Sequence, residues 1–160
     1  MGGVLVWRIE APRPKTGLER ARGPRVFRVV RSSVTGLAVT LDGRTFTATR
    51  AGGAWQLDGR HARRGEAAAL DALVESLARA RAVDAFRSDD LAQFGLATPE
   101  DSITVTARRG TRRLLLGRFN SRGSAIYARR DGDPRVFLLG AGVLSGVERV
   151  FWQRDRLDGS

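Results

Sequence analysis

Residue types that commonly perform catalysis are sparse in this 160-residue chain. His61 is the single histidine and cysteine is absent, so neither the usual zinc ligand sets nor a thiolate nucleophile can be assembled. The serines lack the Gly-x-Ser-x-Gly pattern of a hydrolase nucleophile, and no orienting partner for the histidine is evident. We therefore interpret His61 as a loop residue without a chemical role.

Paired carboxylates could in principle supply a general acid and a general base. The pairs stand at expected turns: Asp89 with Asp90, Glu100 with Asp101, and Asp131 with Asp133. Acid–base catalysis needs two carboxylates that converge in a cleft, whereas neighbouring loop carboxylates usually bind solvent or cap backbone groups. Asp131-Gly132-Asp133 is similar to the start of a calcium loop, but no glutamate closes that loop.

A glycine-rich run at residues 140–146 (GAGVLSG) follows an apolar stretch and opens an expected helix. A dinucleotide-binding fingerprint has a similar glycine pattern, but it begins a βαβ unit and needs an acidic residue about 20 positions later. No such unit follows in the sequence, so we interpret the run as a strand-to-helix turn. The sequence therefore predicts a protein that is not an enzyme and uses no cofactor or metal.

Arginine supplies the strongest chemical signal. The formal net charge is +11, and Lys15 is the only lysine among 28 basic residues. Guanidinium groups gathered on one face would bind an anionic partner, whereas scattered ones form a solvated surface. The number of arginines alone, without evidence that they cluster, favours the interpretation as a solvated surface. The candidate contacts to a partner or anion are Arg108, Arg109, Arg112, Arg113, Arg129 and Arg130.

The elements that would position these arginines follow from hydrophobic periodicity. Alternation with a period of two predicts strands at 34–41, 45–49, 54–57, 103–107, 114–117, 125–128 and 135–139. Helical spacing appears at Leu70, Leu73, Val74 and Leu77, and again over 141–151. The predicted fold class is α+β, a mostly antiparallel sheet with two covering helices. Since strands precede a helix in both parts, two related β-rich halves are a further hypothesis.

Residues 1–33 differ in composition from the rest, being rich in arginine and proline. We interpret them as a basic arm or linker, in which 26–30 could pair as an edge strand, and residues 34–156 as the folded domain. The segment from Asp90 to Pro99 is interpreted as a fixed joint between the β-rich parts, where Pro99 ends any helix begun at Asp89. The residues assigned a structural role are Trp55, Phe94, Gly95, Leu96, Pro99, Gly117 and Tyr127, of which Trp55, Phe94 and Leu96 are expected to be buried.

Several of these residues occur in an order that resembles the DUF4340 family, a bacterial domain of unknown function. The resemblance runs from about Phe46 to Arg156. Its matching features are Trp55-Gln56-Leu57, the helix with Leu70, Leu73, Val74 and Leu77, Asp90-Leu91, Phe94-Gly95-Leu96, Pro99, Leu116-Gly117, Tyr127-Ala128-Arg129 and Asp133-Pro134-Arg135-Val136-Phe137. Arg60 and Glu66 depart from the proline and aspartate that the family tends to place there, which are conservative changes for the fold.

The resemblance implies a domain that is often encoded beside gliding-motility-type ABC transporter components, with an N-terminal membrane anchor and an extracytoplasmic position. Residues 3–7 (GVLVW) are similar to the trimmed end of such an anchor. The basic arm that follows argues for the cytoplasmic side, because arginines near a span favour that side. Orientation therefore stays open.

Two function classes follow from the sequence. The first is a non-catalytic accessory or adaptor domain that binds protein partners in a membrane-associated complex, with anionic lipid as a further complement to its charge. The second, which the family context makes the alternative, is a soluble basic protein that binds nucleic acid or another polyanion. Steep salt dependence of nucleic-acid binding would favour the second class.

Overall fold

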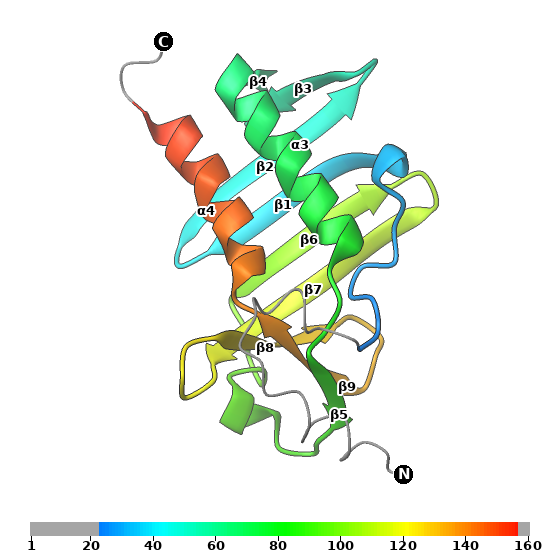
Figure 1. Cartoon of the computed structure of the whole chain (residues 1–160), viewed down its shortest axis with the longest axis vertical. Coiled ribbons are helices and arrows are strands. Elements are labelled where there is room, and N and C mark those ends of the chain that lie inside the picture. Colours follow the sequence, from blue (N-terminus) through cyan, green and yellow to red (C-terminus); the bar gives the residue numbers. More distant parts are fainter. Residues whose placement is uncertain (1–22, 157–160) are drawn as a thin grey trace, which may run out of the picture.

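A computed structural model describes residues 23–156 and shows one nine-stranded sheet with two helices on the same face (Figure 1). The strands are β1 (Val34–Leu41), β2 (Arg44–Ala51), β3 (Ala54–Leu57), β4 (Arg60–His61), β5 (Asp84–Arg87), β6 (Asp101–Ala107), β7 (Gly110–Phe119), β8 (Ala125–Arg130) and β9 (Arg135–Gly140). The helices are α3 (Arg64–Arg79) and α4 (Gly142–Asp155), with 3-10 turns η1 (Arg31–Ser33) and η2 (Leu91–Phe94). The α+β class predicted from periodicity is confirmed.

The sheet joins two antiparallel meanders side by side. Its strand order is β4-β3-β2-β1-β6-β7-β8-β9-β5, and every neighbouring pair is antiparallel. Strands β1 to β4 precede α3, and β6 to β9 precede α4, so the same order of elements occurs twice. The central pair, β1 with β6, connects residues far apart in the sequence, since Leu37 lies opposite Val105 and Val39 opposite Ile103.

Alternation places one side of each strand in the core. Val39 of β1 has Phe46 as its partner in β2, and both side chains are buried beneath the helices. The turn that connects these strands is Asp42-Gly43, with φ angles of 53° and 79°. Positive φ at both central residues is the requirement of a type I′ hairpin, which Asp-Gly meets at low cost. The strands predicted at 34–41 and 45–49 are thus confirmed, the first with the expected bounds and the second extended to 44–51.

The two helices pack against each other as well as on the sheet (Figure 1). The apolar face of α3, with Leu70, Leu73 and Leu77, is fully buried. Gly146 of α4 faces α3 closely, because a Cβ placed there would lie 3.1 Å from the Leu73 side chain. The absence of a side chain at Gly146 lets the helices approach. Within residues 23–156 neither helix is long and apolar enough to cross a membrane.

A buried carboxylate fixes the start of α3. Glu66 is 1% exposed and accepts hydrogen bonds from the Arg63 backbone N–H at 2.8 Å and from the guanidinium groups of Arg60 and Arg63 at 2.6 and 2.9 Å. Arg63 also donates to the backbone carbonyls of Gln153 and Arg154 at the end of α4. One ion-pair network therefore ties the start of α3 to β4 and to the last turn of α4.

The predicted boundary at residue 33 differs from the packing that the structure shows. Val26 and Phe27 are 0% and 1% exposed and belong to the hydrophobic core. Their segment is held by backbone bonds to the chain after α3, from Gly23 N–H to Ala82 O and from Val26 N–H to Ala80 O. Residues 23–33 thus pack as part of the domain, and 26–30 form no edge strand. Residues 1–22, the rest of the predicted arm, lie outside the described residues.

The joint between the halves packs on β7 and β8, on the sheet face opposite the helices. Its 3-10 turn ends at Gly95 (φ 74°), ahead of Pro99, so Pro99 does not terminate it as predicted. Leu96 is buried as expected, whereas Phe94 is only partly buried. Phe94 instead makes aromatic contacts, with its ring centroid 5.4 Å from that of Phe86 and 4.7 Å from that of Tyr127.

Candidate functional site

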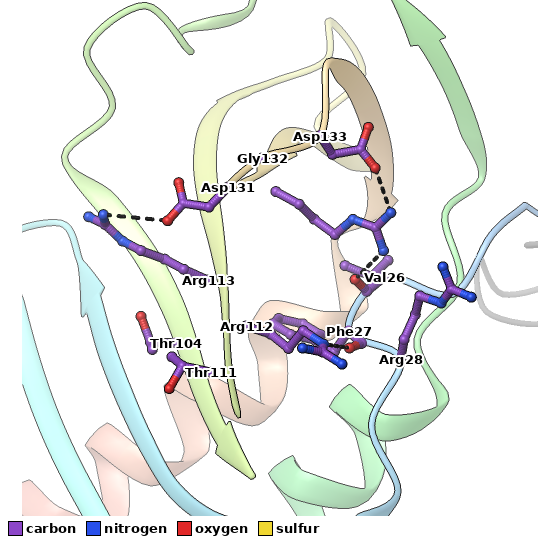
Figure 2. Close-up of a pocket in the computed structure, with 11 residues that line it drawn as sticks. Val26, Phe27, Arg28, Thr104, Thr111, Arg112, Arg113, Asp131, Gly132 and Asp133 are labelled. Atoms are coloured by element: carbon purple, nitrogen blue, oxygen red, sulfur yellow. Dashed lines mark hydrogen bonds and ion pairs between the residues drawn. The ribbon is translucent and has the colours of Figure 1, made fainter. Parts of the chain in front are cut away.

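A pocket of about 760 Å³ lies where three separate segments meet (Figure 2). One wall is the segment Val26-Phe27-Arg28 before η1, and another is the β6–β7 hairpin. The β8–β9 turn closes the third side. The lining residues are Val26, Phe27, Arg28, Thr104, Thr111, Arg112, Arg113, Arg130, Asp131, Gly132 and Asp133.

The pocket exists because β7 is longer than the strand beside it. β8 ends at Arg130, which lies opposite Leu114, whereas β7 already begins at Gly110. Residues 110–113 therefore extend past β8 along one edge while remaining paired with β6 on the other. The Asp131 backbone N–H donates to the Arg113 carbonyl at 3.2 Å, and the chain then turns away toward β9.

Arg130 forms a wall of the pocket. Its side chain is 16% exposed, lies over the Phe137 ring, and donates to the Arg25 and Val26 carbonyls at 3.2 and 3.1 Å. It also donates to the Asp133 carboxylate at 2.6 Å. This arginine is fully engaged in fastening the N-terminal segment to the β8–β9 turn.

Asp133 is the acidic centre of that wall. Hydrogen bonds from Arg135, with further ones from Arg130 and the Arg135 backbone, outweigh burial and hold the pKa of the Asp133 carboxyl well below its usual range. The carboxylate is thus ionised and neutralised by two guanidinium groups. It contributes no negative charge that would repel an incoming anion strongly.

Other arginines at the pocket carry charge that the described chain does not neutralise. Arg112 donates through Nε to the Phe27 carbonyl at 3.2 Å, and Arg28 is exposed with a left-handed φ of 54° (Figure 2). Neither has a carboxylate partner in residues 23–156. A guanidinium nitrogen of Arg113 lies 3.9 Å from a carboxylate oxygen of Asp131, and both side chains are at least half exposed. Such an exposed, long contact is weak and screened by solvent.

The structure separates the arginines that the sequence grouped together. Arg112, Arg113 and Arg130 line the pocket, and Arg108 and Arg109 are exposed in the adjacent β6–β7 turn. Arg129 is not among the residues that line the pocket: it lies opposite Leu115 of β7, on the same face of the sheet as Arg113 but one position further from the β6–β7 turn than Arg130.

Arg28 was missed by sequence analysis because residues 1–33 were interpreted as a linker. The signal that could have found it is the apolar pair Val26-Phe27 in an otherwise basic segment. An isolated apolar pair of this kind is typical of a chain that docks on a core. Docking of Phe27 carries the next residue, Arg28, to the rim of the pocket.

None of the residues assigned a structural role lines the pocket. Trp55 is 3% exposed, and its indole N–H donates to Asp71 of α3 at 2.8 Å. His61 lies exposed on β4 opposite Gln56, in a two-residue strand where a loop was expected. Among residues 23–156 no three histidine or acidic side chains gather as metal ligands would.

The Gly95 and Gly117 backbones form the tight contact between joint and sheet. A Cβ at Gly95 would lie 2.8 Å from the Arg118 backbone nitrogen, and one at Gly117 would overlap the Phe94 carbonyl oxygen. The two motifs, Phe94-Gly95-Leu96 and Leu116-Gly117, are therefore the two sides of one packing contact.

Comparisons with known proteins place these motifs in a family. Residues 55–148 match the domain of unknown function DUF4340. Comparisons with curated proteins and with solved structures gave no match. The matched range begins at Trp55, contains both halves of the Gly95–Gly117 contact, and ends inside α4. Since it covers more than half of the sequence, the chain belongs to the DUF4340 family.

Proposed function

We propose that this domain is a non-catalytic binding module that recognises an acidic protein partner through the arginine-lined pocket. The observation that carries the proposal is the position of Arg28 and Arg112 at one recess, with no carboxylate partner within residues 23–156. Both side chains are exposed, so their guanidinium groups are accessible to a partner. A carboxylate from a partner would supply the counter-charge and charge-assisted hydrogen bonds.

The shape of the site supports a protein segment as the ligand. The cationic groups border a recess of about 760 Å³, which a protruding chain can enter more fully than a flat bilayer surface. The net charge of +11 would speed the approach of an acidic partner, with attraction screened over about 8 Å at physiological salt. Anionic lipid is a second class of ligand that would match the positive charge of the domain.

The setting of the proposed interaction is a membrane-associated complex. This part of the proposal rests on the gene neighbourhood and anchor that the family resemblance implies, including the extracytoplasmic side. The domain would act there as an accessory or adaptor, without catalysis. Affinity purification of the native full-length gene product from membranes tests the setting, and its recovery alone from the soluble fraction would argue against it.

A polyanion-binding protein is the second candidate, and the excess of arginine favours it. Titration of the protein with a glutamate-rich peptide and with duplex DNA over a range of salt concentrations separates the two. The proposal expects the peptide to bind and the double variant Arg28→Glu, Arg112→Glu to weaken that binding by about tenfold or more. DNA binding with a steep salt slope that the variant leaves unchanged would support the alternative instead.

A charge-matched control comes from α4, which contributes no residue to the pocket lining. Arg149 is exposed on this helix. The variant Arg149→Glu changes the net charge in the same direction as each pocket substitution. Equal losses of peptide affinity in Arg149→Glu and Arg112→Glu would show that the overall charge of the protein determines the affinity. The pocket would then not be the binding site.

A further inference from the structure

Among residues 23–156, the edge of β7 beside the pocket has no neighbouring strand. Residues 110–113 pair with β6 on one side, and no strand of residues 23–156 covers them on the other. Elsewhere the sheet continues on both sides of β7, since β8 pairs with it from Leu114 to Phe119. The uncovered stretch faces the recess and therefore differs from an ordinary outer strand of the sheet.

Hydrogen-bonding groups of the backbone point into this recess. In an antiparallel hairpin with a two-residue turn, the residues that flank the turn bond each other, and every second residue after them does the same. Ala107 faces Gly110 across the turn and Val105 faces Arg112, so the N–H and C=O of Thr111 are directed outward. The bond from Asp131 N–H to the Arg113 carbonyl confirms which residues point outward.

We propose that this edge binds an extended acidic peptide segment as an added strand, which would pair with β7 beyond the end of β8 at Arg130. The proposal rests on the function proposed above and specifies how the acidic partner is held. Backbone bonds to Thr111 would align the peptide, as in other cases where a peptide joins a sheet edge. Arginine side chains would then select its residues.

The arrangement of arginines explains why consecutive acidic residues would fit. Side chains alternate along β7, so Arg112 lies on the helix-covered face and Arg113 on the opposite face. Neighbouring residues of an added strand also alternate between these faces. Successive carboxylates would therefore meet Arg112 with Arg28 on one face and Arg113 on the other, and opposite charges across strands stabilise the pair.

Other occupants fit the edge less well. The chain's own N-terminal 22 residues contain more basic than acidic residues, with Glu10 and Glu19 against Arg8, Arg13, Lys15, Arg20 and Arg22. A second copy of the chain brings the same net charge of +11 to the contact. Like charges brought to one recess repel, so both are disfavoured relative to an acidic segment.

Proline at position 111 tests the backbone contact separately from the arginine charges. Thr111→Pro removes the outward N–H and leaves the bonds of Arg112 to β6 in place. Strands tolerate proline at an edge position whose N–H points away from the neighbouring strand. The control Thr111→Ala alters the same side chain and keeps the N–H. The probe is a fluorescein-labelled peptide with a run of glutamates flanked by valine and threonine, and binding is read as anisotropy.

The expected result is that Thr111→Pro weakens binding by about tenfold while Thr111→Ala stays within about twofold of the wild type. A second probe, in which proline alternates with glutamate, keeps the acidic character but cannot pair as a strand, and it should bind as weakly as the proline variant does. Amide exchange of Thr111 should slow on binding of the first probe. Thermal unfolding of both variants verifies that the fold is retained.

The outcomes separate the two proposals. If both probes bind equally and Thr111→Pro has no effect, while Arg112→Glu still abolishes binding, strand addition is wrong and the acidic-partner function stands. If neither probe binds the wild type, both proposals are overturned. Should Thr111→Pro fail to fold, equal affinities of the two probes for the wild type would by themselves refute strand addition.

Discussion

Gly95 and Gly117 lie backbone against backbone, with no room for a side chain at either position. A Cβ at Gly117 would overlap the Phe94 carbonyl oxygen and lie 3.0 Å from the Leu96 side chain, and Gly95 adopts a φ of 74°. The joint after η2 therefore packs closely on β7, and the Leu96 side chain is buried between the joint and this strand. Two short motifs separated in the sequence thus define one contact, which holds the joint against β7.

Gly117→Ala is expected to lower the free energy of unfolding by about 1–3 kcal/mol, the cost of forcing extra atoms into a packed contact. Chemical denaturation measures the change. The control is Gly142→Ala at the start of α4, where a Cβ would meet no atom within 4 Å. Equal stabilities of the two variants would contradict the packing role of Gly117.

The same contact predicts an order of effects within the joint. Gly95→Val should destabilise the fold more than Ala97→Val, because Gly95 has a left-handed φ that β-branched residues adopt only with strain and Ala97 is exposed. Melting temperatures of the two variants test this order. Indistinguishable melting temperatures would show that the joint adapts to a side chain at position 95.

Trp55→Ala is expected to cost about 3–5 kcal/mol of unfolding free energy, as truncation of a buried aromatic residue usually does. Trp55 is 3% exposed, contacts the Arg50 guanidinium, and donates its indole N–H to Asp71. The matched control is Trp152→Ala in α4, whose side chain is 59% exposed. Urea denaturation of both variants compares a core and a surface tryptophan in the same protein.

Periodicity predicted the strands and helices well because most of them bury one face. The alternation over β1, β2 and β6 reflects a sheet covered by helices on one side only, which is where a period of two is strongest. By contrast, β5 has a short sequence with no clear alternation, and its pairing with β9 depends on tertiary contact. β4 contains only Arg60 and His61, both exposed, and left no hydrophobic signal.

The candidate site was harder to predict than the fold. The arginines of the β6–β7 hairpin were found because they are close in sequence. The pocket also needs Arg28, which follows Phe27 from a distant segment, and it needs β8 to stop before β7 does. Neither the docking of that segment nor the relative lengths of two strands can be obtained from local sequence patterns.

Phe27→Ala tests whether residues 23–33 belong to the domain. Phe27 is 1% exposed within the core, so its truncation is expected to cost about 3–5 kcal/mol. Val30→Ala, at a position 67% exposed in the same segment, should change stability by less than about 0.5 kcal/mol. A Phe27→Ala variant as stable as the wild type would restore the interpretation of this segment as a separate linker.

Stability should fall in acid through the buried carboxylate of α3. Burial alone would raise the pKa of Glu66, but hydrogen bonds from Arg60 and Arg63 outweigh it and lower the pKa to about 2. Because the folded-state pKa lies below the value in the unfolded chain, the ionised carboxylate stabilises the fold above about pH 4.5. That contribution is lost progressively as the pH falls from about 4.5 toward 2.

Glu66→Gln isolates this contribution. The variant should be less stable than the wild type at neutral pH, since it leaves Arg63 without its carboxylate at the junction of α3 and α4. Its unfolding free energy should also depend less on pH between about 4.5 and 2, although Asp133 still titrates in both proteins. Denaturation curves at several pH values measure both effects. Parallel pH profiles for variant and wild type would mean that Glu66 is not the group whose protonation loosens the helix pair.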